Sequence, residues 1–222
     1  MCGLAGILCY EGGSTLPGRP LLQKMIGTLR HRGPDSCGFY ADRHVGLAHA
    51  RLSIIDLAGG DQPMANEDRT LWIVFNGEIF NYIELRNDLQ RCGHRFRTSS
   101  DTEVILHAFE EWGTESFTRF NGQWAFALWD SRTRRLCLCR DRVGVRPLYY
   151  TQQGHRLLFA SEIKALFADR SVVRRIDPRG LTQVFTYWCP IAPTTVFEGI
   201  EELRPGCYRT YGMNGLLAEG QY

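Results

Sequence analysis

Short hydrophobic runs separated by turn-forming residues dominate this chain, and this pattern predicts a protein rich in β-strands. The first run, residues 3–10, is apolar and predicts a buried strand, followed by a loop over residues 11–18. Residues 46–55 and 71–75 are also predicted strands, and the second leads directly into Asn76-Gly77. The other predicted strands cover residues 38–41, 123–130, 135–140, 148–151 and 156–160, with a few extended residues after Thr194.

Apolar residues recur at helical spacing in several segments between these strands. One helix is expected to begin at Pro20 and to end before Gly33-Pro34. The run Ser100-Asp101-Thr102-Glu103 has the form of a capping box, so a second helix should begin there and end at Gly113. Strands with helices between them, without regular β-α-β alternation, predict an α+β fold in which helices cover sheets. Further helices are predicted over residues 82–89, after Ser161 and from Pro178.

The composition fits a protein with a sizeable core and little excess charge. Of its 222 residues, 44% are hydrophobic and 12% aromatic, which is enough to fold without covalent staples. The 26 basic and 24 acidic residues give a formal net charge of +2, so neither nucleic acid nor a membrane is an expected partner. No run approaches the roughly 18 apolar residues that span a bilayer, and no signal peptide is recognisable. A cytoplasmic location is therefore expected.

The eight cysteines predict neither a disulfide framework nor a metal site. They are too sparse for a disulfide scaffold, which agrees with a reducing compartment. Cys137 and Cys139 form the one close pair, but they alternate as strand residues do, and no second pair or nearby histidine completes a zinc set. No metal ligand is therefore expected in this chain.

The start of the chain, Met1-Cys2-Gly3, contains a candidate nucleophile. Removal of Met1 would leave Cys2 with a free α-amine, whose reference pKa of about 7.7 to 8.0 suits it to accept the thiol proton. The terminal amine would then take the place of histidine in a nucleophile–base pair. The alternative is an ordinary cysteine in a buried strand.

Attack on an amide carbonyl would require donors for the oxyanion, and Asn76-Gly77-Glu78 offers two. These are the side-chain amide of Asn76 and the backbone N–H of Gly77. The spacing alone favours the other interpretation, an Asn-Gly turn at the end of a strand.

Three charged residues are candidates for binding a zwitterionic amino acid. Arg51 stands among small and apolar residues, so it is either part of a buried ion pair or a ligand for a carboxylate. Asp101 lies in the first turn of its predicted helix, where a structural role is common. Asp101 and Glu78 could bind an ammonium group if the fold brings them together.

Two charged turns are also candidates. His31 and Arg32 are either a catalytic pair or, as the pattern favours, part of a turn whose charges hold a loop. The segment 141–147 is predicted to be a structural turn, because its glycine and proline redirect the chain between strands.

An ordered set of motifs closely resembles the class II glutamine amidotransferase domain of glutamine-hydrolysing asparagine synthetases. The resemblance covers nearly the whole chain. The motifs are MCGLAG at residues 1–6, RHRGPD at 30–35, HARLSIID at 49–56, NGEIFN at 76–81, SSDTEVIL at 99–106, RDRVGVRPLYY at 140–150, ASEIKALF at 160–167 and LRPG at 203–206.

The resemblance implies an αββα N-terminal-nucleophile fold, a four-layer sandwich of two antiparallel sheets between helices. It also implies a glutaminase that needs no cofactor in this domain and acts on L-glutamine. Position by position, the resemblance implies the following roles: Cys2 as nucleophile with its α-amine as base, Asn76 and Gly77 as the oxyanion hole, Arg51 for the α-carboxylate, Asp101 and Glu78 for the α-ammonium, and the backbone of Leu52, Ser53, Ile54 and Ile55 as pocket lining. Arg146, where the family often has lysine, stands outside this set.

Family members continue into an ATP-pyrophosphatase synthetase domain. Residues 1–210 are therefore expected to form the glutaminase domain and residues 211–222 to begin the connection to that second domain. ATP and Mg²⁺ are expected only in the second domain, where ammonia would amidate aspartate. The alternatives are another acceptor, such as a peptide or polysaccharide, or a non-catalytic docking or regulatory module. As to oligomeric state, a homodimer is an open alternative to a monomer.

Overall fold

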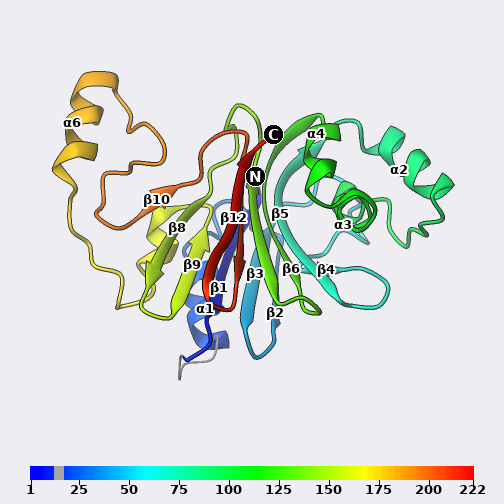
Figure 1. Ribbon diagram of the computed structural model, residues 1–222, viewed down its shortest axis with the longest axis horizontal. Helices are drawn as coiled ribbons and strands as arrows, with labels where there is room; N and C mark the ends of the chain where they lie inside the picture. Colours follow the sequence, from blue (N-terminus) through cyan, green and yellow to red (C-terminus); the bar gives the residue numbers. More distant parts are fainter. Residues whose placement is uncertain (13–17) are drawn as a thin grey trace.

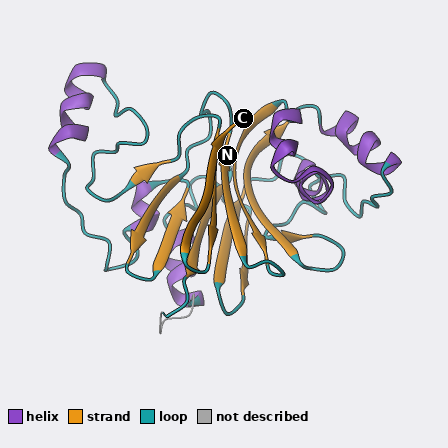
Figure 2. Cartoon of the chain, viewed as in Figure 1, coloured by secondary structure: helices purple, strands orange, loops and turns teal. Residues whose placement is uncertain are grey.

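The computed structural model describes residues 1–12 and 18–222. Residues 13–17 of the expected loop lie outside the described residues. In the described part, the chain forms two antiparallel sheets of six strands each, which face one another as Figures 1 and 2 show. The predicted strands are thus assembled into two layers.

The nucleophile candidate, Cys2, directly precedes an inner strand of the first sheet. Its strand order is β10-β8-β9-β1-β3-β2, so the first strand of the chain is flanked on both sides. The strands are β1 (Gly3–Cys9), β2 (Ser36–Ala41), β3 (Val45–Arg51), β8 (Tyr149–Gln153), β9 (Arg156–Ala160) and β10 (Glu201–Glu202).

The second sheet has the order β12-β11-β7-β6-β5-β4. Its inner face packs on the first sheet through a cluster of buried side chains that includes Leu4, Val74, Trp129 and Phe159. Its strands are β4 (Met64–Ala65), β5 (Leu71–Ile79), β6 (Gly122–Asp130), β7 (Arg135–Arg140), β11 (Cys207–Gly212) and β12 (Gly215–Gln221).

Helices cover the outer face of each sheet. On the first sheet, α1 (Arg19–Gly27) and α5 (Ile163–Leu166) bury Leu22, Met25 and Leu166 against the strands. On the second, α2 (Tyr82–Arg91), α3 (Asp101–Trp112), the 3₁₀ turn η1 (Gly113–Glu115) and α4 (Ser116–Arg119) form the outer layer. The expected four-layer αββα arrangement is therefore confirmed. No helix in the described part of the chain is both long and apolar enough to cross a membrane.

The last helix, α6 (Pro178–Tyr187), differs from the others because it stands away from both sheets (Figure 1). Within it only Gly180 is buried. Large apolar side chains on and after α6 are exposed to solvent.

Two strand predictions are wrong at their ends. The strand expected over 46–55 ends at Arg51, because the N–H groups of Leu52 and Ser53 bond to the Cys2 sulfur and the Asp35 carboxylate instead of a neighbouring strand. The interpretation of Asn76-Gly77 as a turn is also wrong. β5 continues to Ile79 in unbroken register with β6.

Gly77 is required by this close pairing. It lies opposite Trp124, and an added Cβ would come within 2.0 Å of the Gln123 carbonyl oxygen. Gly77 is therefore needed because the backbones of β5 and β6 come close together there, and not because the chain turns.

The expected start of a connecting segment, residues 211–222, is instead integrated into the second sheet. These residues form the end of β11 and all of β12, which pair with each other as a hairpin. A boundary at residue 210 would cut that hairpin, so residues 211–222 belong structurally with the rest of the domain.

Candidate active site

A cleft of about 520 Å³, part of it open to solvent, lies where β1, β3 and β5 meet the start of α3. It gathers nine of the ten residues predicted to form the site; Ser53 is not among the lining residues. The lining residues are Met1, Cys2, Arg51, Leu52, Ile54, Ile55, Gly60, Gln62, Phe75, Asn76, Gly77, Glu78, Ser100, Asp101, Thr102 and Arg146.

Strand register places the thiol beside the arginine. β1 and β3 pair with Gly3 opposite Ala50, so the preceding residue, Cys2, lies at the end of β3 where Arg51 is. All residues of β1 are buried, and a Cβ at Gly6 would come within 2.2 Å of Phe159. A one-residue slip would bring a larger residue to that position, so this close contact fixes the register and with it the position of Cys2.

A buried histidine joins this corner to the second sheet. His49 Nε2 lies 3.0 Å from the carbonyl oxygen of Phe75, and His49 is fully buried. Burial lowers the His49 pKa to about 4, so the ring is neutral and donates through Nε2. The next residue of β5 is Asn76, which brings the amide to the cleft.

The Cys2 side chain is held by backbone groups. Its sulfur accepts from the Leu52 N–H at 3.4 Å, and the Cys2 carbonyl accepts from Arg32 Nε at 2.9 Å. Burial raises the pKa of the thiol, while the Leu52 N–H, the N-terminal charge and Arg51 act in the opposite direction. The thiol is therefore protonated near neutral pH and needs a base before it can attack a carbonyl.

Arg32 and His31 have different positions. The Arg32 guanidinium pairs with Glu162 at 2.9 Å as well as with the Cys2 carbonyl, so it fixes the backbone of the nucleophile candidate. His31 is half exposed and bonds to the same glutamate. Neither residue lines the cleft, which agrees with the interpretation of this motif as a turn held by charges.

Asn76 carries an unsatisfied donor. Its side chain is 1% exposed, and among the described residues its Nδ2 has no hydrogen-bond partner. Leaving such a group unpaired in the interior costs about 1 to 3 kcal/mol. The arrangement is explained if a bound molecule supplies the missing acceptor.

The Gly77 N–H points to the same side. The Phe75 N–H bonds to Gln62 Oε1 at 2.6 Å, and its carbonyl bonds to His49, so Phe75 does not exchange hydrogen bonds with β6. In an antiparallel ladder this pattern repeats every second residue. Gly77 therefore also directs its N–H away from β6, toward the side where Ile79 meets α3.

Arg51 forms an ion pair in this structure. Its guanidinium is 2.8 Å from Asp61 Oδ1 and donates to the carbonyls of Asp56 and Leu57. The Arg51 side chain is 7% exposed, whereas that of Asp61 is 73% exposed. The partner of Arg51 is thus a solvent-exposed carboxylate, which the carboxylate of a bound molecule could replace.

Asp101 and Glu78 place two carboxylates in the cleft. Asp101 is 4% exposed, its Oδ2 accepts from the Ile79 N–H at 3.0 Å, and it is the first residue of α3. Burial, with a smaller contribution from Glu78, raises the Asp101 pKa to about 6. A cation placed between the two carboxylates would relieve this cost.

The start of α3 only partly follows the predicted capping box. Ser100 Oγ does accept from the Thr102 N–H, as an N-cap should. Glu103, however, accepts from the N–H groups of Arg97 and Thr98 instead of returning to Ser100. The cap is confirmed and the reciprocal half of the box is wrong.

Sequence reasoning missed Gln62 and gave no role to Arg146. Gln62 bridges β5 and α3, because its amide also donates to Thr102 Oγ1 at 3.2 Å. The Arg146 backbone is held by Asp141, whose carboxylate collects several N–H groups of the 141–147 turn, so that turn is structural as predicted. The Arg146 Nε is buried without a partner among the described residues. No local motif marks Gln62, because its role appears only when distant segments meet.

The chain matches a model of the glutamine amidotransferase domain over residues 1–222. It is 39% identical to asparagine synthetase [glutamine-hydrolyzing] 3 of Bacillus subtilis (strain 168), over 97% of this chain and 36% of that protein. It is also 32% identical to the amidase chry2 of Gibberella zeae, over 94% of this chain and 32% of that protein. The chain thus spans about a third of the length of these relatives.

Solved structures share the fold at low sequence identity. The structure of the allosteric regulatory enzyme of purine biosynthesis aligns with a TM-score of 0.71 and 19% identity, over 99% of this chain and 49% of that one. This likeness confirms the arrangement of sheets and helices.

Proposed function

Because the chain belongs to the glutamine amidotransferase domain family, we propose that it hydrolyses L-glutamine to L-glutamate and ammonia in this cleft through a thioester on Cys2. One observation carries the proposal. The cleft brings a thiol, an unsatisfied buried amide and a pair of carboxylates together from β1, β5 and α3.

The reaction begins with the thiol proton moving to the Cys2 α-amine. The thiolate attacks the side-chain amide carbon, and the resulting oxyanion accepts hydrogen bonds from Asn76 Nδ2 and the Gly77 N–H. The ammonium of Cys2 returns the proton to the leaving nitrogen, the carbon–nitrogen bond breaks and ammonia departs. Water then attacks the γ-glutamyl thioester through a second oxyanion, giving glutamate and the free thiol.

The charged residues of the cleft suit the two ends of free glutamine. The α-ammonium would lie against Asp101 and Glu78, and the α-carboxylate would take the place of Asp61 on Arg51. Backbone groups of residues 52–55 would complete the pocket, with Leu52, Ile54 and Ile55 in contact and Ser53 holding the loop through its bond to Asp35.

This chemistry requires removal of Met1. While Met1 remains, the Cys2 nitrogen is an amide and cannot accept a proton, and Met1 itself occupies part of the cleft wall. Intact mass of the purified protein should be lower by one methionine. A protein that keeps Met1 and still turns over glutamine would contradict the assignment of the α-amine as base.

A glutaminase assay tests the proposal. Wild type should release glutamate, and Cys2→Ala should release none above background. Cys37→Ala is the matched control, because Cys37 is an exposed thiol away from the cleft and its loss should leave the rate unchanged. Equal release by wild type and Cys2→Ala would leave the non-catalytic docking module as the function.

For the whole protein we propose ATP-dependent amidation of aspartate with the ammonia released here. Support comes from the relatives, whose names describe glutamine-hydrolysing asparagine synthetases about three times as long as this chain. ATP and Mg²⁺ would bind in the ATP-pyrophosphatase synthetase domain, and this domain would need no cofactor. The relative named as an amidase keeps another acceptor as the alternative. Product analysis with glutamine, ATP and aspartate, or a peptide in its place, separates the two.

The exposed apolar side chains around α6 are the surface that we assign to that second domain. Phe185 and Trp188 are 81% and 92% exposed, and Leu181 and Ile191 lie nearby in sequence. In the full-length protein, Phe185→Ser with Trp188→Ser should leave glutamine hydrolysis unchanged and uncouple it from amidation. A homodimer is the alternative occupant, and concentration-dependent sedimentation of the isolated domain would reveal it.

A further inference from the structure

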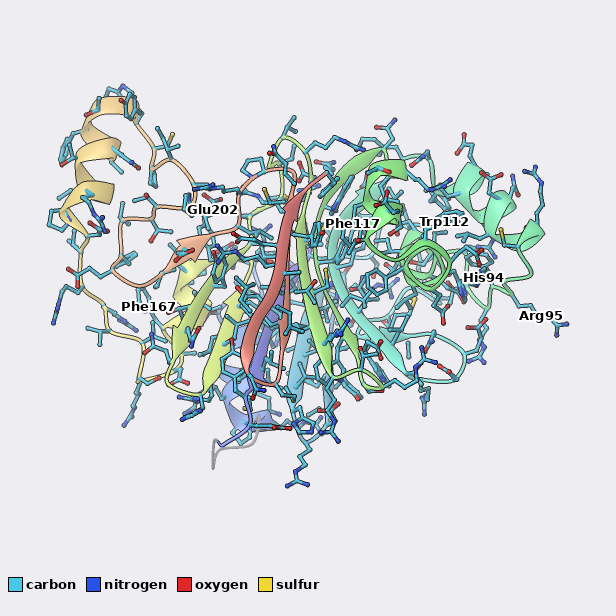
Figure 3. All side chains as sticks on the ribbon, viewed as in Figure 1. His94, Arg95, Trp112, Phe117, Phe167 and Glu202 are labelled. Carbon is cyan, nitrogen blue, oxygen red and sulfur yellow. The ribbon has the colours of Figure 1, made fainter. Side chains whose placement is uncertain are left out.

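Two histidines and a glutamate meet on the outer side of the second sheet, apart from the cleft. His107 and Glu110 lie one turn apart on α3, and His94 comes from the segment that follows α2. In Figure 3, His94 lies beside α3 on the outer part of the molecule. Their ligand-type atoms all lie within 4.8 Å of one another.

The three atoms form a triangle of the size that a metal ion requires. His94 Nδ1 and His107 Nδ1 are 3.1 Å apart, Glu110 Oε2 is 3.0 Å from His107 Nδ1 and 3.9 Å from His94 Nδ1. The circle through corners with sides of 3.1, 3.0 and 3.9 Å has a radius of about 2.0 Å, and zinc–nitrogen and zinc–oxygen bonds measure about 2.0 to 2.2 Å. The spacing of the three atoms therefore suits one bound ion.

The surrounding groups independently match the outer shell of a metal site. In such sites the second ring nitrogen of each histidine faces a carboxylate, and the ligating carboxylate is itself hydrogen-bonded. Here His94 Nε2 lies 3.1 Å from Glu111, His107 Nε2 lies 3.8 Å from Glu103, and the other Glu110 oxygen accepts from Asn66 at 2.7 Å. His94 and Glu110 are thus held by hydrogen bonds, whereas His107 only faces Glu103 beyond hydrogen-bond distance.

The charges around the cluster favour a cation. Among the described residues, His107 Nε2 has no hydrogen-bond partner although its side chain is only 1% exposed. Two imidazoles face four carboxylates, so negative charge exceeds positive charge around the buried His107 ring. These carboxylates belong to Glu67, Glu103, Glu110 and Glu111.

We propose that His94, His107 and Glu110 form a binding site for one divalent transition-metal ion of the zinc type. Imidazole with a carboxylate suits zinc, and three protein ligands leave a fourth position for water. The ion would tie the segment after α2 to the middle of α3. Asp101 begins the same helix about 9 Å away along its axis, so the site would be structural and not catalytic.

Metal content tests the proposal. The tag-free protein carries Cys2→Ala, so that the cleft thiol does not contribute, and is stripped with a chelator and dialysed against zinc. This Cys2→Ala protein should bind one more equivalent of zinc than the same protein that also carries His94→Gln. His155→Gln is the matched control, because His155 is an exposed histidine in a turn and its loss should change nothing. Mass spectrometry of the bound metal gives the stoichiometry.

Stability supplies a second measurement. Zinc at about 100 times its dissociation constant should raise the melting temperature of the Cys2→Ala protein by roughly 5 to 10 °C. The same rise is expected when His155→Gln is added, and no rise is expected when His94→Gln is added. Circular dichroism should show that all three variants are folded.

A third measurement needs no variant. Zinc should shift the ring-nitrogen signals of His94 and His107 in nuclear magnetic resonance spectra and leave those of His155 in place. Equal zinc content with and without His94, or unmoved His94 and His107 signals, would overturn the proposal and leave the cluster as a network of ion pairs. Both outcomes are independent of glutamine hydrolysis.

Discussion

Ionised Asp101 should lower the free energy of unfolding while it binds the substrate. The substitution Asp101→Asn is therefore expected to make the protein more stable and also less active. Burial raises the Asp101 pKa from 3.8 to about 6. The folded chain therefore binds this proton more tightly than the unfolded chain. Stability falls as pH rises from about 4 to 6, and the full cost persists above that range.

The destabilisation by ionised Asp101 at pH 8 can be calculated from the rise in its pKa. With about 1.4 kcal/mol for each pH unit between 3.8 and about 6, ionised Asp101 lowers the free energy of unfolding by about 3 kcal/mol. Asparagine carries no charge and can still accept from the Ile79 N–H. Asp101 also accepts a hydrogen bond from the Thr102 N–H, and the NH₂ group of asparagine cannot accept one, so part of the gain in stability is lost. A net increase of about 2 kcal/mol is expected at pH 8.

Urea unfolding at pH 8 and pH 5 measures the effect. At pH 5 the net advantage of Asp101→Asn should fall to about a third, because the folded wild type is then mostly protonated at this carboxyl and the cost of its charge is about half as large. Asp88→Asn is the matched control: Asp88 is an exposed helix residue, and its substitution should change stability by less than about 0.5 kcal/mol at either pH.

The same variant should bind glutamine poorly. Loss of a charge-assisted contact to the α-ammonium should raise KM by about 10- to 100-fold, since such a bond is worth about 1.5 to 3 kcal/mol. A variant that is no more stable at pH 8 would refute the reasoning about burial. A variant with unchanged KM would refute the role of Asp101 in the pocket.

Three other substitutions test separate parts of the structure. Asn76→Ala should lower kcat by about 100-fold or more with little change in KM, because an oxyanion donor is lost; an unchanged kcat would exclude Asn76 from that role. Gly77→Ala should lower the free energy of unfolding by about 3 kcal/mol, because its Cβ would meet the Gln123 carbonyl at 2.0 Å; full stability in urea would contradict the close pairing. With EDTA present, wild-type stability should fall by about 2 kcal/mol from pH 7 to 9.5. Burial lowers the His107 pKa, but the nearby carboxylates of Glu103 and Glu110 outweigh burial and raise the pKa to about 9. The stabilisation by protonated His107 is therefore complete below pH 6.5 and is lost as the pH rises through 9. His107→Gln should lack this slope in urea unfolding measured across the same range, and an equal slope would contradict the assignment.

Local pattern was sufficient to predict most elements of the fold. β7 and β9 have the predicted bounds, and α6 begins at Pro178 as expected, because each depends on its own apolar spacing and turn residues. The wrong predictions occur where contact with a segment distant in the sequence determines the local structure. Asn76-Gly77 has the sequence of a turn, and only the presence of β6 beside it keeps the strand extended.

The site shows the same division. Motifs identified the individual residues, but spacing could not show that Arg51 and Asp101 share a cleft with Cys2. Their convergence depends on the β1–β3 register and on the bond from Ile79 to Asp101, which join segments far apart in sequence. His94 and His107 illustrate the limit: thirteen positions apart, with no metal-binding spacing, they meet only because α3 folds back beside the segment after α2.

Two groups of the cleft are in an unfavourable state that a bound substrate would relieve. Asn76 has a free donor, and Asp101 holds its charge at a cost. Each of these features opposes folding, and the closely packed sheets on either side provide the stability that tolerates them. A bound glutamine would offer an acceptor to the first and an ammonium to the second. Glutamine should therefore stabilise Cys2→Ala, which cannot consume it, and the effect should be much weaker when Asp101→Asn is added, because one of the two interactions has been removed.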